Sequence, residues 1–307
     1  MPLFKDEGGK LELVKEEKFD LEKNLQTLTE KNLELIFGLS FITSEFALQN
    51  FRIDTLAYDE ENKSFVVVEY KRDRSFSVID QGYSYLALML NNKADFILEY
   101  NEKMKENLKR DDVDWSQSRV VFVSNSFTTY QQNAINFKDL PIELWSVSKY
   151  DNGSILFNQL KAPDSNESIK TVSQNKTIQS VNREVKKPTI DEHFKEGWGK
   201  ARELFEELRV RVMDLDSRIV EKPNKPYIGY KIDNKNIIGV NVRKSNLLIH
   251  LTRTEPKDLK DPEGKVQYVK NSMKHYNQHI SSVVIDSVED IDYAMSLIKQ
   301  VYKRQFA

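Results

Sequence analysis

The alternation of apolar and polar residues over residues 51–71 predicts a β-hairpin. Two stretches rich in β-branched and aromatic residues lie there, and a polar segment typical of a turn separates them. A turn centred in that segment places Leu56 across the ladder from Val67, and Asp54 across from Glu69. Because successive side chains on a strand point to opposite faces, Asp54 and Glu69 share one face of the hairpin.

Other periodic stretches of the N-terminal half predict helices and strands on either side of this hairpin. In chain order the pattern favours a helix over residues 20–36, a strand over 40–48, a helix over 78–90 that Ser77 caps, and strands over 94–100 and 119–124. With the hairpin, the elements up to residue 100 follow the order α-β-β-β-α-β. Further along, the sequence indicates a polar insertion over 101–115, a short helix over 128–137 and a hairpin with an Asn-Gly turn over 143–159.

A change in composition separates the C-terminal half from this α/β domain. No aromatic residue occurs between Phe157 and Phe194, and Ser, Asn, Gln, Lys and Pro dominate. We therefore expect a domain over residues 1–160, a flexible linker over 161–190 and a small α+β domain over 191–307. In the last domain the pattern predicts a helix over 194–220, strands over 227–232, 237–242, 247–251 and 282–285, and a helix over 288–302.

Length, charge and composition narrow the class of protein. A chain of 307 residues favours two domains, and 31% charged with 39% hydrophobic residues is typical of a soluble globular protein. The net charge of −2 gives no overall basic field, so a surface for nucleic acid would have to be a local patch. The absence of cysteine excludes disulfides and thiolate zinc sites, and no apolar run is long enough for a signal peptide or a membrane span. We expect a cytoplasmic protein without a membrane partner.

The opposed carboxylates of Asp54 and Glu69 are the strongest candidates for chemistry. Two carboxylates that face each other repel, and a divalent cation such as Mg²⁺ bound between them relieves that repulsion. Lys71 follows Glu69 by two residues and shares its face, so its ammonium group reaches the same place. The simpler alternative is a surface hairpin with cross-strand ion pairs. The apolar residues 65–68 argue against it, because they indicate strands buried on both faces, where unpaired carboxylates are costly.

These residues resemble the signature of a known superfamily. Asp54 followed by Glu69 and Lys71 is similar to the D…(D/E)xK motif of the PD-(D/E)XK nucleases, which share the restriction-endonuclease-like fold. Gln81 and Tyr85 are similar to the QxxxY element of the RecB-like branch of that superfamily. The predicted order α-β-β-β-α-β is also that of the restriction-endonuclease-like core.

The resemblance implies a fold, an activity and a set of residue roles. The fold would be α/β with the αβββαβ core, and the activity that of a Mg²⁺-dependent endodeoxyribonuclease of restriction, defence or repair, for which Mn²⁺ can substitute. One residue departs from the motif, since Ile53 replaces the Pro that names the superfamily. The implied roles are metal binding by Asp54, Glu69 and the backbone carbonyl of Tyr70, activation of water by Lys71, support of the metal shell by Glu22, and binding of DNA by Gln81, Tyr85, Arg72 and Arg74.

Alternatives stay open at several of these positions. Glu22 is otherwise a solvated carboxylate at the start of a helix, and Gln81 and Tyr85 otherwise belong to the core. The chain is otherwise a nucleic-acid-binding or scaffolding protein that keeps the fold without cutting, or a nuclease directed at RNA, since charge does not separate DNA from RNA. Many members of the superfamily cut as dimers, which leaves a homodimer open. The C-terminal domain resembles a small uncharacterised bacterial domain with no assigned activity.

Overall fold

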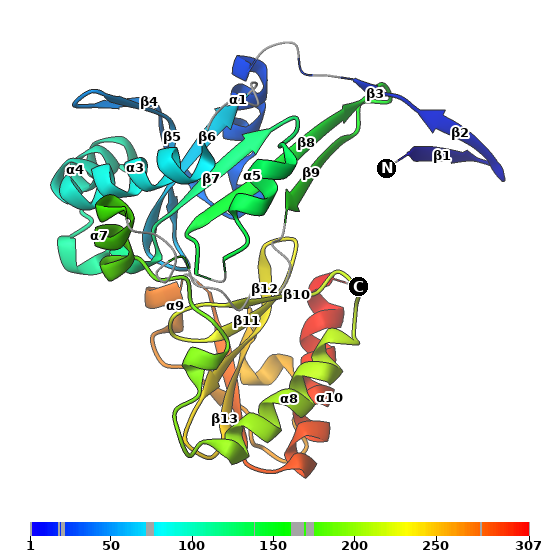
Figure 1. The fold of residues 1–307 in the computed structure, drawn as a ribbon. Coiled ribbons are helices and arrows are strands. Elements are labelled where there is room, and N and C mark those ends of the chain that lie inside the picture. Colours follow the sequence, from blue (N-terminus) through cyan, green and yellow to red (C-terminus); the bar gives the residue numbers. More distant parts are fainter. Residues whose placement is uncertain are drawn as a thin grey trace. The chain divides into compact units, whose positions relative to one another are not determined.

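The computed structural model divides the chain into two compact units (Figure 1). The units are residues 1–187 and residues 188–307. The structure describes residues 2–17, 19, 22–71, 77–137, 139–160, 169, 175–276 and 278–306, without the side chain of His275.

A seven-stranded mixed sheet organises the first unit. Its strands lie in the order β3-β8-β7-β6-β5-β4, and β9 pairs with β8. The strands are β3 (Glu16–Glu17), β4 (Ser40–Leu48), β5 (Phe51–Asp59), β6 (Ser64–Lys71), β7 (Arg119–Ser124), β8 (Ile142–Tyr150) and β9 (Ile155–Leu160). Strands β6, β7 and β8 are parallel neighbours, whereas β4, β5 and β6 are antiparallel. Before this sheet, β1 (Leu3–Glu7) and β2 (Lys10–Val14) form a separate two-stranded hairpin.

Strands β5 and β6 confirm the predicted hairpin. Leu56 pairs with Val67, which is the register that the alternation predicts. This register carries Asp54 toward Glu69 at the end of the hairpin opposite its turn. Residues 64–70 of β6 are all buried, because β5 and β7 flank the strand and helices cover both of its faces. The exposed-hairpin alternative therefore does not apply.

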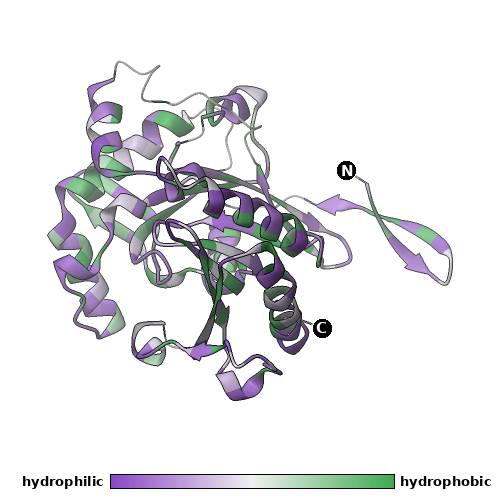
Figure 2. Cartoon of the chain, turned by 90° about the horizontal axis from the view of Figure 1, so that it is seen from below, coloured by the Kyte–Doolittle hydropathy of each residue, from purple (hydrophilic) through white to green (hydrophobic). Residues whose placement is uncertain are grey.

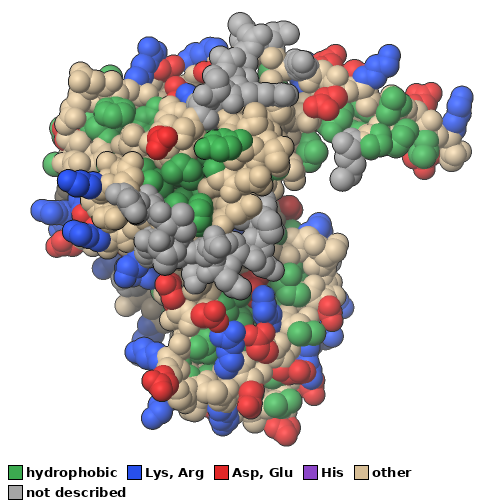
Figure 3. Space-filling model, in the orientation of Figure 1, with side chains coloured by type: hydrophobic (Ala, Val, Ile, Leu, Met, Phe, Trp, Pro, Cys, Tyr) green, Lys and Arg blue, Asp and Glu red, His purple; other side chains and the backbone are tan. Residues whose placement is uncertain are grey.

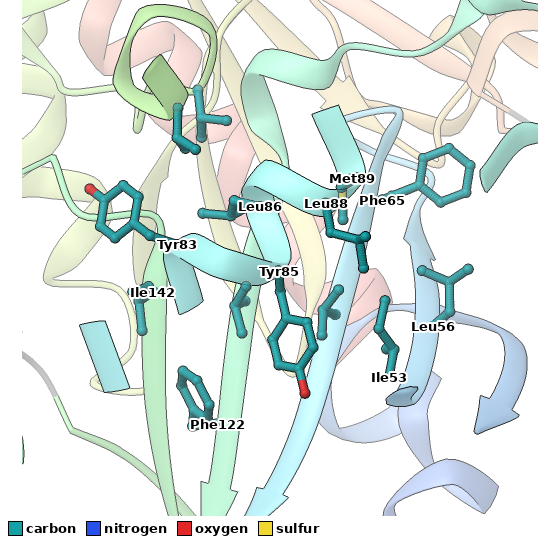
Figure 4. Close-up of a cluster of buried hydrophobic side chains, with 14 of the residues drawn as sticks. Ile53, Leu56, Phe65, Tyr83, Tyr85, Leu86, Leu88, Met89, Phe122 and Ile142 are labelled. Carbon is teal, nitrogen blue, oxygen red and sulfur yellow. The ribbon is translucent and has the colours of Figure 1, made fainter. Parts of the chain in front are cut away.

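Helices cover the two faces of this sheet. On the face that bears Val66 and Val68 lie α1 (Glu22–Lys31) and α2 (Leu33–Phe37). On the face that bears Phe65 and Val67 lie α3 (Val78–Asn91), α4 (Lys93–Met104) and α7 (Lys176–Glu184), with the short α5 (Thr129–Ala134) beside them. Figure 4 shows the core on the Phe65 and Val67 face of this sheet, with side chains of α3 lying over those of the strands. The hairpin is thus held rigidly from both sides.

Two local features fix the position of α3. The hydroxyl of Ser77 accepts a hydrogen bond from the backbone N–H of Asp80 at 3.3 Å, which confirms the predicted N-cap. One turn further on, a Cβ placed on Gly82 would lie 2.5 Å from Cδ1 of Ile142. The absence of a side chain therefore lets α3 approach the sheet closely, and Gln81 beside it faces the end of β6.

The strand predicted over residues 94–100 is wrong, since these residues belong to helix α4. Phe96 and Tyr100, four residues apart, are buried, while Leu98 between them is 58% exposed. That spacing is helical, but a short apolar run does not distinguish a buried strand from a buried helix by itself. Strand β7 takes the place of the expected last strand, so the order α-β-β-β-α-β is completed with α4 inserted.

The segments expected to be an insertion and a linker contain ordered structure that packs on the first unit. Residues 101–115 include the end of α4 and a 3-10 helix, and Trp115 stacks on Phe65 with ring centroids 5.3 Å apart. Within residues 161–190 lies α7, whose Asn182 accepts a hydrogen bond from the hydroxyl of Tyr83 at 2.9 Å. The first unit accordingly runs to residue 187, because a few apolar residues at helical spacing suffice to dock a short helix.

The second unit is an antiparallel sheet with two long helices. Its strands lie in the order β10-β11-β12-β13-β15-β14, and they are β10 (Val220–Pro223), β11 (Ile228–Ile232), β12 (Lys235–Val242), β13 (Leu247–Thr252), β14 (Gln267–Tyr268) and β15 (Ile280–Ile285). The helices are α8 (Gly199–Met213), α9 (Ser272–Tyr276) and α10 (Val288–Phe306). The four predicted strands and the closing helix are confirmed. The helix predicted over 194–220 is too long, because α8 ends at Met213 and Val220 already pairs in β10.

The distribution of polarity agrees with these cores. Figure 2 shows hydrophobic residues along the central strands of each unit and hydrophilic residues on the outer sides of many helices. On the face of the second unit seen in Figure 3, acidic and basic side chains are interspersed and form no patch of one sign. None of the helices in the described part of the chain combines the length and apolarity needed to cross a bilayer.

Candidate active site

Asp54 is fixed at the end of the β5–β6 ladder by its own side chain. Its Oδ2 accepts a hydrogen bond from the backbone N–H of Tyr70 at 3.0 Å, so the carboxylate replaces a main-chain partner there. From the opposite face of the sheet, Nε2 of Gln26 on α1 donates to the backbone carbonyl of Asp54 at 3.0 Å. Both contacts restrict the directions in which the remaining Asp54 oxygen can point.

Glu69 lies beside Asp54 and is almost completely buried, with 3% of its surface exposed. Its Oε1 accepts hydrogen bonds from Nζ of Lys71 at 2.7 Å and from Nε2 of Gln81 at 3.3 Å. Its Oε2 is buried and makes no hydrogen bond of normal geometry among the described residues, although the Tyr85 hydroxyl lies near enough to Glu69 to lower the pKa of its carboxyl group. A buried carboxylate oxygen without a donor is costly, and it normally marks a strained, catalytic or ligand-binding position.

The electrostatics of the pair follow from this burial. Burial and, to a smaller extent, the neighbouring charge of Asp54 raise the pKa of Glu69 to about 7, against the opposing effects of Lys71 and of the Tyr85 hydroxyl. Burial also raises the pKa of Asp54, although the Tyr70 N–H and Lys71 oppose that rise. Near neutral pH the two carboxyl groups therefore share less than their full negative charge, as expected for like charges held together out of water.

Gln81 and Tyr85 meet on one face of α3, as predicted. Nε2 of Gln81 lies 3.3 Å from the Tyr85 hydroxyl and 3.3 Å from Oε1 of Glu69. The Tyr85 side chain is 5% exposed, and its pKa is raised by burial and by Glu69. In the structure these two side chains support the Glu69 carboxylate from the helix. Their predicted binding of DNA stays a prediction.

The remaining expected site residues are Glu22, the backbone carbonyl of Tyr70, Arg72 and Arg74. Glu22 is exposed on the first turn of α1, close enough for its charge to raise the pKa of Asp54. Its support of a metal shell through water stays a prediction, as does a metal contact from the Tyr70 carbonyl. Arg72 and Arg74 lie outside the described residues.

Two residues near Asp54 were not predicted from the sequence. Gln26 follows Glu22 by four residues, so the helical period could have placed it on the same face of α1. Glu45 occupies the position of β4 opposite Asp54, between the pairs formed by Ser44 and Phe46, and has a φ of 57°. No local sequence signal indicates this left-handed conformation for a glutamate.

The chemistry of these side chains fits a hard divalent cation. Asp54 and Glu69 offer carboxylate oxygens, one of them buried and without a hydrogen bond from the part of the chain that the structure describes, and oxygen ligands are those that Mg²⁺ prefers. Within the part of the chain that the structure describes, no three His, Cys, Asp or Glu side chains are grouped so that they could hold a metal ion. A cation at this site would therefore depend on the two carboxylates, backbone oxygen and water.

Comparison with known proteins identifies a close relative of the whole chain. A protein of Haemophilus influenzae, described as an uncharacterized protein, is 44% identical over 304 residues, which span 99% of this chain and 100% of that one. The chain belongs to the family of this protein. In addition, a family model described as a domain of unknown function, DUF5655, matches residues 190–305. This match covers nearly all of the second unit and agrees with the resemblance noted for the C-terminal domain.

Solved structures that resemble parts of the chain do so weakly. They include an EndoMS complex with double-stranded DNA (21% identity, TM-score 0.25), a repair endonuclease from Pyrococcus abyssi (20%, 0.21) and SfsA from Pyrococcus furiosus with Ca²⁺ (15%, 0.24). They cover 37%, 38% and 45% of this chain. The chain in turn covers 40%, 42% and 62% of them, less than two thirds of each. TM-scores this low support no argument about this chain.

Proposed function

We propose that this protein is a metal-dependent endonuclease that hydrolyses phosphodiester bonds in DNA. The observation that carries the proposal is Glu69, a carboxylate buried beside Asp54, with one oxygen that accepts no hydrogen bond from the described residues and the other bound by Lys71 at 2.7 Å. Without a ligand, this arrangement lowers the stability of the fold. It offers carboxylate oxygens to a cation and an ammonium group to a phosphate. The spacing of the three residues in β5 and β6 agrees with the D…ExK motif.

Each side chain has a role that its contacts support. Asp54 and Glu69 would hold a Mg²⁺ ion, which would supply a Lewis acid for the phosphate and lower the pKa of water. Glu69 binds a cation only after it loses its proton, so its raised pKa makes ligand binding depend on pH near neutrality. Lys71, whose Nζ lies 2.7 Å from Oε1 of Glu69, would orient water or stabilise negative charge on the phosphate. Gln81 keeps Oε1 of Glu69 in place.

DNA is the substrate that the motif implies, and RNA is the other polymer to test. The decisive experiment measures cleavage of supercoiled plasmid, linear duplex, single-stranded DNA and RNA with Mg²⁺ or Mn²⁺. The variants are Asp54→Asn and Lys71→Met. The matched control is Lys103→Ala, because Lys103 is an exposed lysine of α4 that pairs only loosely with Glu99, at 3.7 Å.

Metal-dependent cleavage that both site variants lose and the control keeps is the expected result. Cleavage of RNA alone would change the substrate and leave the site intact. If the wild-type protein binds DNA but cuts no polymer with either metal, the nuclease proposal fails and a non-catalytic binding protein replaces it. Equal cleavage by the wild type and both variants would place the activity elsewhere.

A further inference from the structure

Two exposed cationic side chains lie next to Asp54 and share one carboxylate. Lys23, on the first turn of α1, places Nζ 3.1 Å from Oε1 of Glu45, and Arg52 of β5 contacts Oε2 of the same residue. The side chains of Lys23 and Arg52 are 61% and 69% exposed, whereas that of Glu45 is 29% exposed. One anchored anion thus holds two solvent-facing cations.

The backbone directs Glu45 to this place. It lies opposite Asp54 in the β4–β5 ladder, and its φ of 57° is unfavourable for a residue with a side chain. Although partial burial alone would raise the pKa of Glu45, hydrogen bonds from Lys23 and Arg52 lower it, so the carboxylate stays ionised. Its charge also contributes to raising the pKa of Asp54. Glu45 therefore belongs electrostatically to the candidate active site.

Ion pairs of this kind exchange easily. Lys23 and Arg52 are mostly exposed, so water solvates both cations well when they separate from Glu45, and ion pairs near the surface contribute little net stability. A phosphodiester group is a good replacement for Glu45, since arginine and lysine bind phosphate oxygens with strong, charge-assisted hydrogen bonds. Arg52 precedes Asp54 by two residues on the same strand, so its side chain leaves the same face as the carboxylate.

We propose that Lys23 and Arg52 form a phosphate-binding subsite for the nucleic-acid strand. In the free protein Glu45 forms ion pairs with both cations, and a phosphate of the substrate replaces it. The proposal rests on the proposed function, because it names the groups that would grip the strand next to the candidate active site. The subsite adds contacts from α1 and β5 to those expected from Arg72 and Arg74, which follow β6 in the sequence. Glu45 would act as an intramolecular competitor that lowers the affinity of this subsite for a phosphate group.

The test measures binding without cleavage. Fluorescence anisotropy of labelled single- and double-stranded DNA and RNA oligonucleotides is recorded in EDTA at several salt concentrations. We expect Arg52→Ala and Lys23→Ala each to weaken binding about tenfold and to reduce the slope of log affinity against log salt by about one. Glu45→Gln should tighten binding about two- to fivefold, since an exposed pair no longer has to be broken.

A double-mutant cycle separates competition from general repulsion. If Glu45 acts through its two cations, the gain from Glu45→Gln disappears in the Lys23→Ala/Arg52→Ala background. If it only repels phosphate, the gain persists there, and the proposal is overturned. Glu99→Gln and Lys103→Ala, which alter a comparable pair on α4, should leave affinity unchanged. Circular dichroism and thermal melting confirm that each variant is folded.

The outcomes distinguish this inference from the proposed function. If the wild type binds nucleic acid and the Lys23 and Arg52 variants bind it equally well, the subsite is wrong while the nuclease proposal stands. If the wild type binds none of the polymers at any salt concentration, the subsite fails, whereas the proposed function is decided separately by the cleavage assay with Mg²⁺ or Mn²⁺. The subsite is supported if Lys23→Ala and Arg52→Ala lower the affinity for nucleic acid, Glu45→Gln raises it, and the control variants do not change it.

Discussion

The β5–β6 hairpin buries a carboxylate at each end, and the two ends are built in opposite ways. At the turn, Asp59 accepts hydrogen bonds from the backbone N–H groups of Glu61 and Asn62 at 3.1 and 3.0 Å, and from Arg119 at 2.8 Å. At the other end, Glu69 is equally buried, since each is 3% exposed. However, one oxygen of Glu69 has no donor in the described structure, and its pKa is raised to about 7.

This difference separates a structural carboxylate from one available for chemistry. Arg119 lies between Asp59 and Glu143, with Nε 2.9 Å from Oε1 of Glu143, and its pKa is raised by both despite burial. Both oxygens of Asp59 are therefore hydrogen-bonded and its charge is paired, although Nε of Arg119 makes no hydrogen bond of normal geometry in the described structure. At the other end, the fold tolerates an incompletely satisfied Glu69, as proteins commonly do where a ligand or reaction requires it.

Removing a charge at the active end should affect catalysis most. We expect Asp54→Asn and Lys71→Met each to lower the cleavage rate about 100- to 10,000-fold, the range for loss of a group that positions or transfers a proton. The free energy of unfolding should change little, because Asn still accepts the Tyr70 N–H bond. Single-turnover cleavage assays measure the rate. A comparable loss of rate per folded molecule in Arg119→Met would erase the distinction between the two ends.

Removing the cation at the turn should affect stability instead. Arg119→Met leaves the buried Asp59 and the half-buried Glu143 without their shared partner, so we expect unfolding to become easier by about 3 kcal/mol. Urea denaturation followed by circular dichroism gives the value. Lys103→Ala, an exposed lysine on α4, should change stability by no more than about 0.5 kcal/mol. A loss for Arg119→Met as small as this would show that the turn network is solvated.

The raised pKa of Glu69 predicts a dependence of stability on pH in the absence of metal. The folded chain keeps this proton up to about pH 7, whereas an unfolded glutamate loses it near 4.5. Stability present below pH 4.5 should therefore be lost as the pH rises through about 7, by about 3 kcal/mol in total. Glu69→Gln should remove that loss and be more stable than wild type at pH 8. Urea denaturation in EDTA at pH 5 and pH 8 measures this change in the free energy of unfolding. The same change in the wild type and in Glu69→Gln would contradict the burial argument.

The smallest effect concerns the helix residue that holds Glu69. Gln81→Ala removes a 3.3 Å hydrogen bond to Oε1, so we expect about 1 kcal/mol of lost stability and a fall in kcat of tenfold or less. A change in kcat with KM unaltered assigns Gln81 to positioning Glu69. A rise in KM alone would instead support the predicted contact with the DNA strand. Gln132→Ala on α5, whose amide donates to the Phe127 carbonyl, is the matched control.

Much of the candidate site was predictable because it depends on short-range rules. The two-residue period of strands and one polar turn fix the register that brings Asp54, Glu69 and Lys71 together. The four-residue spacing on a helix brings Gln81 toward Tyr85. Glu45 was not predictable in this way, because its position depends on a left-handed residue in β4. The helical period places Gln26 on the same face of α1 as Glu22, but its contact with Asp54 depends on the docking of α1 against the sheet.

By itself, the sequence determined the hairpin, its register, the cap of α3 and the separation of an N-terminal α/β unit from a C-terminal domain, because local periodicity, turn residues and composition encode these features. Only the tertiary structure decided that residues 94–100 are helical, that α7 belongs to the first unit and that α8 ends at Met213. Short apolar segments fit more than one element, and packing against the sheet selects among them. Tertiary burial likewise left Glu69 without a full set of donors while Asp59 obtained one, a difference that two acidic residues in similar strands do not reveal.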